Sequence, residues 1–240
     1  MKEQLAIFGL SIGFFAIIIL PYLVFGFYFS PWYISIPDII DIVFYGLVIG
    51  LSFYLLFEEK LSDAPSWIKY LFIYLFILHF TGHGFHWAAN AMNESIINAG
   101  SGTPQYVSEY AYFLDEVLSH YIMYPTFLAM LLLLLVADMF YLQKEKEEYS
   151  NAMKLMSIPS IIFGFSYMIS SAEAQLPYLT IAMAVAYICM IGWIIKVKGY
   201  DELNKRPYQA FIFETSIVIL IVAIIYWILF PGFPEPSKIL

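Results

Sequence analysis

Long apolar runs alternate with short polar connections along the whole chain. The runs are near the length of about twenty residues that a helix needs, at 1.5 Å rise per residue, to cross a hydrocarbon core about 30 Å thick. Because the connections are short, we expect one all-α, polytopic transmembrane bundle that forms a single domain over residues 1–240. The pattern predicts seven spans, at residues 5–28, 38–57, 66–90, 112–142, 155–172, 177–196 and 209–230.

The composition agrees with a membrane protein. Hydrophobic residues make up 62% of the chain and charged residues 12%, against about 45–50% and about 25% in soluble domains. The net charge of −8, without any basic patch, argues against nucleic-acid binding. The expected partners are therefore membrane lipid and a hydrophobic small-molecule substrate. The single cysteine, Cys189, rules out an intrachain disulfide and a cysteine-based metal site.

Basic residues indicate the orientation of the bundle, because Lys and Arg in short connections mark the cytoplasmic side. The first, third and fifth connections contain neither residue. The second, fourth and sixth are flanked or filled by Lys60, Lys69, Lys144, Lys146, Lys154, Lys196, Lys198, Lys205 and Arg206. We therefore expect a multi-pass protein of the cell membrane with a cytoplasmic N-terminus and an outer C-terminus.

The histidines are the main functional signal. All four lie between positions 79 and 120, and three of them fall within eight residues of the third span. At 100° per residue, a polar stripe occupies an arc of about 80° on one face of that helix, formed by His79, His83, His86, Asn90 and Asn93. A stripe of this kind cannot face lipid, because unpartnered polar groups are costly in hydrocarbon.

The fourth span supplies a second polar face. Glu116 and His120 are one helical turn apart, and Asp115 lies beside them near the outer end. Spans three and four are antiparallel, so the two faces should meet in the outer half of the membrane, with His86 and Glu116 at similar depth. Asp41 of the second span and Glu173 of the fifth connection are further candidates.

Imidazoles and carboxylates together are typical ligands of a divalent metal, and zinc fits them best. One ion cannot bind both His79 and His86, which are about 10 Å apart along the helix axis. The pair from the third span is therefore His83 with His86, or His79 with His83. We expect the metal ligands His83, His86, His120 and Glu116, with Glu116 or Asp115 as the general base and His79 as a further candidate.

These residues predict a metal-dependent membrane enzyme, a hydrolase that acts on a lipid or another hydrophobic substrate at an outer-leaflet site. Two other functions remain open. In a redox protein, His83 and His120 would bind haem b or copper, and Gly82 and Gly84 would make room for a porphyrin. In a proton-coupled transporter, the histidines and carboxylates would form a proton relay.

Seven spans, an inner N-terminus and intramembrane histidines resemble the adiponectin-receptor and alkaline-ceramidase group of zinc hydrolases. That group has an H-x-x-x-H pair in its last span, where this chain has no histidine. Retinal proteins have the opposite orientation and a lysine in the last span, which this chain also lacks. No residue role is transferred from either group.

Overall fold

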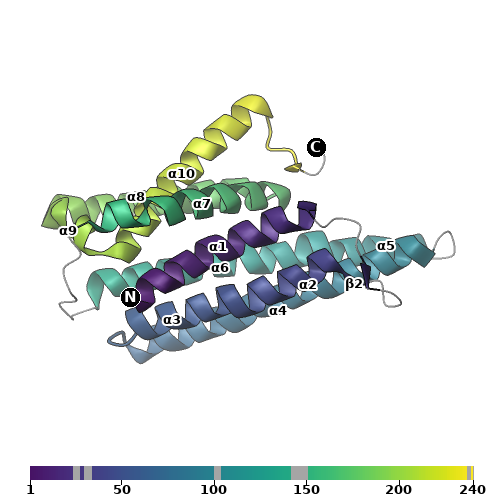
Figure 1. The fold of residues 1–240 in the computed structure, drawn as a ribbon, viewed down its shortest axis with the longest axis horizontal. Helices are drawn as coiled ribbons and strands as arrows, with labels where there is room; N and C mark the ends of the chain where they lie inside the picture. The colour runs from purple at the N-terminus through teal and green to yellow at the C-terminus, as the bar shows by residue number, and fades with distance from the viewer. Residues whose placement is uncertain (24–27, 30–33, 100–103, 142–150, 237–238, 240) are drawn as a thin grey trace.

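The computed structural model describes residues 1–23, 28–29, 34–99, 104–141, 151–236 and 239. Within these residues, seven helical spans are long and apolar enough to cross a membrane, and they form one elongated bundle (Figure 1). The all-α, seven-span fold class is thereby confirmed. A minor addition is a two-residue antiparallel pair between β1 (Tyr28–Phe29) and β2 (Ile34–Ser35).

Two of the seven spans are composite, because a π-helical segment interrupts each of them. The second span consists of α2 (Ile36–Ile42), the π-helical η1 (Val43–Ile49) and α3 (Gly50–Lys60). The fourth consists of α5 (Gln105–Tyr112), the π-helical η2 (Phe113–Ser119) and α6 (His120–Phe140). The other helices are α1 (Lys2–Leu23), α4 (Ser66–Ala99), α7 (Ala152–Glu173), α8 (Pro177–Lys198), the short α9 (Asp201–Lys205) and α10 (Pro207–Leu229).

The predicted limits of the first, third and fourth spans need correction. Helix α1 ends at Leu23 and not at residue 28, since Tyr28 belongs to β1. Helix α4 continues to Ala99, and the fourth span begins at Gln105. Hydropathy marks only apolar residues, whereas the more polar residues that follow position 90 are also helical as far as Ala99. Lys144 and Lys146, used to predict the orientation, lie outside the described residues.

The two ends of the bundle differ in what they contain. The N-terminus, the turn at residues 61–65 and α9 lie at one end, which we call the N-side (Figure 1). The β pair, α5 and the C-terminal segment lie toward the other end, the C-side. In these terms, the sequence predicts that the N-side is cytoplasmic.

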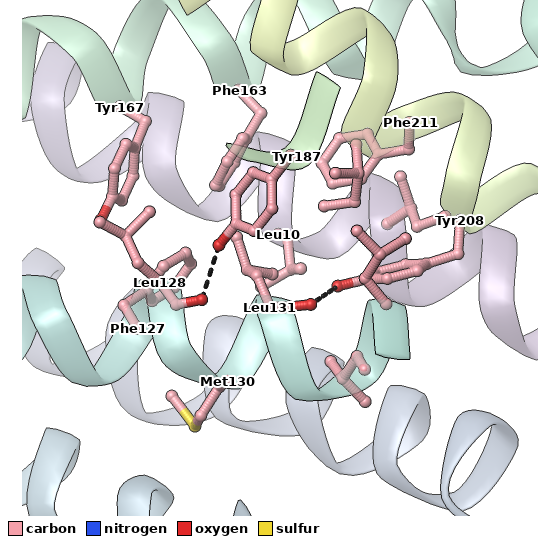
Figure 2. Close-up of a cluster of buried hydrophobic side chains, with 14 of the residues drawn as sticks. Leu10, Phe127, Leu128, Met130, Leu131, Phe163, Tyr167, Tyr187, Tyr208 and Phe211 are labelled. Carbon is pink, nitrogen blue, oxygen red and sulfur yellow. Dashed lines mark hydrogen bonds between the residues drawn. The ribbon is translucent and has the colours of Figure 1, made fainter. Parts of the chain in front are cut away.

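Helix α6 lies at the centre of the packing. Two buried phenols reach its backbone from different helices, as Figure 2 shows. Tyr187 of α8 donates a hydrogen bond of 2.6 Å to the Leu128 carbonyl, and Tyr208 of α10 donates one of 2.9 Å to the Leu131 carbonyl. Each of these carbonyls can accept the phenol in addition to its own helical hydrogen bond, because a carbonyl oxygen has two lone pairs. The bonds fix α6 relative to α8 and α10.

A buried ion cluster closes the N-side. The Lys60 Nζ lies 2.5 Å from Glu3 Oε1 and 2.6 Å from Asp138 Oδ1, and the whole lysine is only 2% exposed. Gln209 donates a 2.7 Å hydrogen bond to the other Asp138 oxygen. We call Glu3, Lys60, Asp138 and Gln209 the N-side ion cluster. Its ion pairs and hydrogen bond connect α1, α3, α6 and α10 inside the bundle.

We predict that Lys60→Met strongly destabilises the protein. The substitution keeps most of the apolar volume but leaves the Glu3 and Asp138 carboxylates without their common cation, which costs about 3–5 kcal/mol for a buried pair. Chemical unfolding in detergent, followed by circular dichroism, measures the change. Lys69→Met is the matched control, because the Lys69 Nζ only donates to the Ser62 carbonyl at the surface. Equal stability of the two variants would contradict the prediction.

The orientation can be tested by labelling single cysteines. In a Cys189→Ser background, Glu109→Cys places a thiol on the C-side and Asp63→Cys places one on the N-side, both at exposed positions. We expect a membrane-impermeant maleimide added to intact cells to label residue 109 and not residue 63. Labelling of residue 63 alone would invert the predicted orientation.

Candidate functional site

A cavity of about 250 Å³ opens between α1, the second span, α4, α6 and α7. We call it the histidine chamber, because all four histidines line it. It lies nearer the C-side, since α2 starts there and its first turns contribute to the wall. Its other polar lining residues are Asp38, Asp41, Tyr45, Trp87, Asn90, Tyr124, Tyr167 and Ser170.

His79 is the innermost of the histidines and both of its ring nitrogens are engaged. Its Nδ1 lies 3.0 Å from the Met123 carbonyl, which can only accept, so Nδ1 carries the proton. Nε2 is then the acceptor for the Tyr45 hydroxyl at 2.9 Å. The ring is fully buried. In this arrangement His79 has no free nitrogen for a metal or for proton abstraction, and it holds Tyr45 in place.

Tyr45 in turn positions His83. The two rings stack with centroids 3.9 Å apart and planes 11° apart. The His83 Nε2 faces the Asp41 carboxylate at 3.4 Å. His83 is thus held between an aromatic face from η1 and a carboxylate from α2, and its ring orientation depends on both.

His86 and His120 meet across the interface between α4 and α6. Their ring centroids are 5.2 Å apart, so the structure brings the two polar faces together. His86 Nδ1 lies 2.6 Å from Asp115 Oδ1, at ion-pair distance. His120 Nδ1 lies 3.7 Å from Glu116 Oε2. Three histidines therefore each have a carboxylate beside one ring nitrogen: His83 with Asp41, His86 with Asp115 and His120 with Glu116.

Several buried polar atoms of the chamber make no hydrogen bond within the described part of the chain. They include both ring nitrogens of His83, the Nδ1 of His120 and the indole N–H of Trp87. Leaving a buried donor or acceptor unsatisfied costs about 1–3 kcal/mol. Such an accumulation around one cavity is unusual for a purely structural cluster, because buried polar groups are normally paired.

The side chains do not form a finished metal site. No group of three or more His, Cys, Asp or Glu side chains among the described residues is placed to hold an ion. The rings of His83 and His86 have centroids 6.4 Å apart. Two imidazoles on one tetrahedral ion, with nitrogens about 2.0–2.1 Å from it, have ring centres roughly 5 Å apart. The His86–His120 spacing meets that requirement, whereas His83 would have to move closer.

Gly82 explains how α4 comes so close to α6. A Cβ at this position would lie 2.9 Å from the Met123 Cγ and 2.9 Å from the Ile122 Cγ2, closer than carbon atoms pack. A Cβ at Gly84 would meet nothing within 4 Å. Gly82 therefore permits the helix contact that brings His86 to His120, and Gly84 has no such role.

Both π-helical segments contribute to the site. Tyr45 belongs to η1, and Asp115 and Glu116 belong to η2. A π-helical turn shifts the register of the following residues relative to an α-helix, and such turns are frequent at functional sites. Because of this shift, the directions in which Tyr45 faces His83 and Asp115 faces His86 do not follow from α-helical spacing alone.

Sequence reasoning did not identify Tyr45 or Asp38. Asp38 caps α2 by accepting a 3.2 Å hydrogen bond from the Ser35 backbone and also accepts one of 2.8 Å from the Asn90 side chain. The sequence Ser35-Ile-Pro-Asp38 is a capping-box pattern that could have located the carboxylate at the start of a helix. Tyr45 carries no such signal, since tyrosine is abundant throughout the chain.

Comparison with known proteins adds no functional information. No family model, curated protein or solved structure matches this chain. The chemistry of the site is therefore inferred from its own residues.

We predict opposite effects for Gly82→Ala and Gly84→Ala. At position 82 the added methyl overpacks the interface between α4 and α6 and should cost about 1–3 kcal/mol. At position 84 there is space, and alanine should be neutral or stabilising by up to about 1 kcal/mol through its higher helix propensity. Thermal unfolding midpoints in one detergent compare the two. A midpoint at or above the native value for Gly82→Ala would rule out the close contact.

Proposed function

We propose that the chain is a metal-dependent hydrolase of the cell membrane, whose histidine chamber binds one divalent ion and acts on a hydrophobic substrate. The observation that carries this proposal is the set of buried imidazole nitrogens without hydrogen bonds, beside three carboxylates, inside an apolar bundle. Ionisable groups within membrane spans are costly and by default mark a functional site. Zinc is the ion that suits imidazole and carboxylate ligands best.

The imidazole–carboxylate pairs support this role in a specific way. Histidines that bind a metal usually direct their second ring nitrogen to a carboxylate, which fixes the tautomer and makes the first nitrogen a better ligand. His86 with Asp115 and His120 with Glu116 each have a carboxylate on the Nδ1 side. Their Nε2 atoms would then be free to hold the ion, with His83 as the third ligand.

Glu116 is the best placed general base. Its side chain is 34% exposed, whereas that of Asp115 is 6% exposed and in contact with His86. A divalent ion held by these histidines would supply Lewis-acid chemistry, acidifying a water molecule and polarising a substrate carbonyl. Glu116 would act as the general base that accepts a proton from the attacking water and returns it to the leaving group. His79 and Tyr45 would keep His83 oriented.

Metal analysis of the purified protein tests the proposal. We expect about one zinc per chain, and a loss of at least roughly tenfold in bound zinc for His83→Ala and for His120→Ala, because second-shell and ligand losses typically cost 10–100-fold in metal affinity. Glu109→Gln is the control, since Glu109 is exposed and does not line the histidine chamber, and this variant should retain the metal. If the zinc content were unchanged in the double variant of His83 and His120, the proposal would be refuted.

The absorption spectrum separates this function from a redox protein. A haem-binding preparation would show a Soret band and a copper-binding one would contain stoichiometric copper, whereas a zinc protein is colourless. Either positive result would replace the hydrolase with the redox alternative. His83 and His120 would be the residues to examine first in that case.

A specific observation also keeps the proton-coupled transporter as a second candidate. Titratable groups form a row from Glu116 through His120 and His86 to His83, Tyr45 and His79, with neighbouring rings 3.9–6.4 Å apart. A row of this kind can pass protons when waters complete it. Proton-driven uptake by liposomes that His83→Ala and His120→Ala abolish would favour transport over hydrolysis.

A further inference from the structure

The indole of Trp87 carries a hydrogen-bond donor that the proposed metal chemistry does not use. Trp87 lines the histidine chamber, and its Nε1–H is buried and makes no hydrogen bond within the described residues. A buried tryptophan N–H normally has a partner, and an unsatisfied buried donor is costly. The N–H is therefore available to a ligand that enters the chamber.

Trp87 lies beside the histidines that we propose as metal ligands. It follows His83 by four residues on α4, so the two side chains lie on one face of the helix, one turn and about 6 Å apart along its axis. His86 directly precedes Trp87 and also lines the chamber. A ligand atom bound to the indole N–H would thus lie next to the proposed ion site.

The carboxylates that line the chamber do not bind this donor. Asp38 accepts a 2.8 Å hydrogen bond from the Asn90 amide, and Asp41 faces the His83 ring at 3.4 Å. Neither is bonded to the indole, whose N–H has no partner in the described part of the chain. Because an indole N–H can only donate, its partner must be an acceptor. In a hydrolase substrate, the carbonyl oxygen is such an atom.

One wall of the chamber is aromatic. The Phe14 ring packs against Tyr45, Phe127 and Tyr167 with centroids 6.1, 4.9 and 5.5 Å apart, and all four residues line the chamber. Tyr167 is only 1% exposed, and its hydroxyl is a second buried group without a hydrogen bond in the described residues. The volume of about 250 Å³ is below the roughly 300–1,000 Å³ of pockets for drug-sized ligands. The enclosed part of a ligand is therefore small.

We propose that Trp87 donates its indole N–H to the carbonyl oxygen of the substrate, an ester or amide whose short acyl group packs against the aromatic wall. This deepens the proposed function and rests on it for the reaction, in which the donor would stabilise the negative charge that develops on the carbonyl oxygen. Binding of a carbonyl compound through Trp87 does not itself require an ion. The carbonyl subsite and the metal site can therefore fail separately.

An NMR titration of the full-length protein in nanodiscs, isotope-labelled at the tryptophan indole nitrogens, tests the donor. The probes are 2-heptanone and heptane, which have equal numbers of carbon atoms and differ in the carbonyl. We expect 2-heptanone to shift the Trp87 indole proton downfield in a saturable manner, because a new N–H···O hydrogen bond forms, and heptane to leave it unchanged. The Trp87→Phe variant identifies this resonance among those of the five tryptophans. Equal shifts with both probes, or no shift with 2-heptanone, would overturn the subsite.

Trp87→Phe should weaken 2-heptanone binding by roughly fivefold and leave the zinc content unchanged, because it keeps an aromatic ring and removes one hydrogen bond. Equilibrium dialysis, with empty nanodiscs as the blank, measures the affinity. Trp67→Phe is the matched control on the same helix, since Trp67 is 60% exposed and does not line the chamber. Unchanged affinity in Trp87→Phe would contradict the subsite. A selective shift by 2-heptanone in protein that never holds zinc would support the subsite and defeat the hydrolase instead.

Discussion

A polar group inside this bundle is costly unless it finds a partner within the protein, because neither lipid tails nor apolar side chains can hydrogen-bond to it. The N-side ion cluster satisfies this constraint almost completely. Lys60 is shared between Glu3 and Asp138, and Gln209 occupies the remaining oxygen of Asp138. Since these residues come from four helices that are distant in sequence, the need to neutralise one buried lysine determines how those helices meet. The histidine chamber satisfies the same constraint less completely, because several of its buried ring nitrogens make no hydrogen bond within the described residues.

Helix α6 connects the two regions. Its N-side end carries Asp138 of the ion cluster, its middle accepts hydrogen bonds from Tyr187 and Tyr208 (Figure 2), and its first residue is His120. Gly82 allows α4 to pack directly against it. A helix held at so many points is a rigid support, and a site with defined geometry needs such support on regular elements. This helix also lines the histidine chamber with His120, Met123, Tyr124 and Phe127.

The number of spans and the polar faces of the third and fourth spans could be predicted from the sequence, because apolar length and helical phase are local properties. The proximity of His86 to His120 also follows from antiparallel neighbours with matching polar stripes. Tyr45 could not be identified, since its role depends on a π-helical register and on the depth of His79. Lys60 was interpreted only as an orientation signal, because burial among carboxylates from other helices is not visible in local sequence. The roles of the metal ligands stay predictions.

The two polar clusters provide a comparison within one molecule. Both lie among apolar helices and both contain carboxylates and basic groups, so the cost of burying them is of the same kind. In the N-side ion cluster, the charged atoms contact opposite charges at 2.5–2.6 Å. In the histidine chamber, which has about 250 Å³ of space, only the His86–Asp115 contact is as close, at 2.6 Å, among the imidazole–carboxylate pairs of the described residues. The carboxylates beside His83 and His120 lie 3.4 and 3.7 Å away, and these two rings keep nitrogens without hydrogen bonds. The tight pairing in the ion cluster shows that this fold can bring buried charges from different helices into contact. Proteins depart from such local rules mainly at functional sites, and this difference supports the proposal that the histidine chamber, and not the ion cluster, is the functional site.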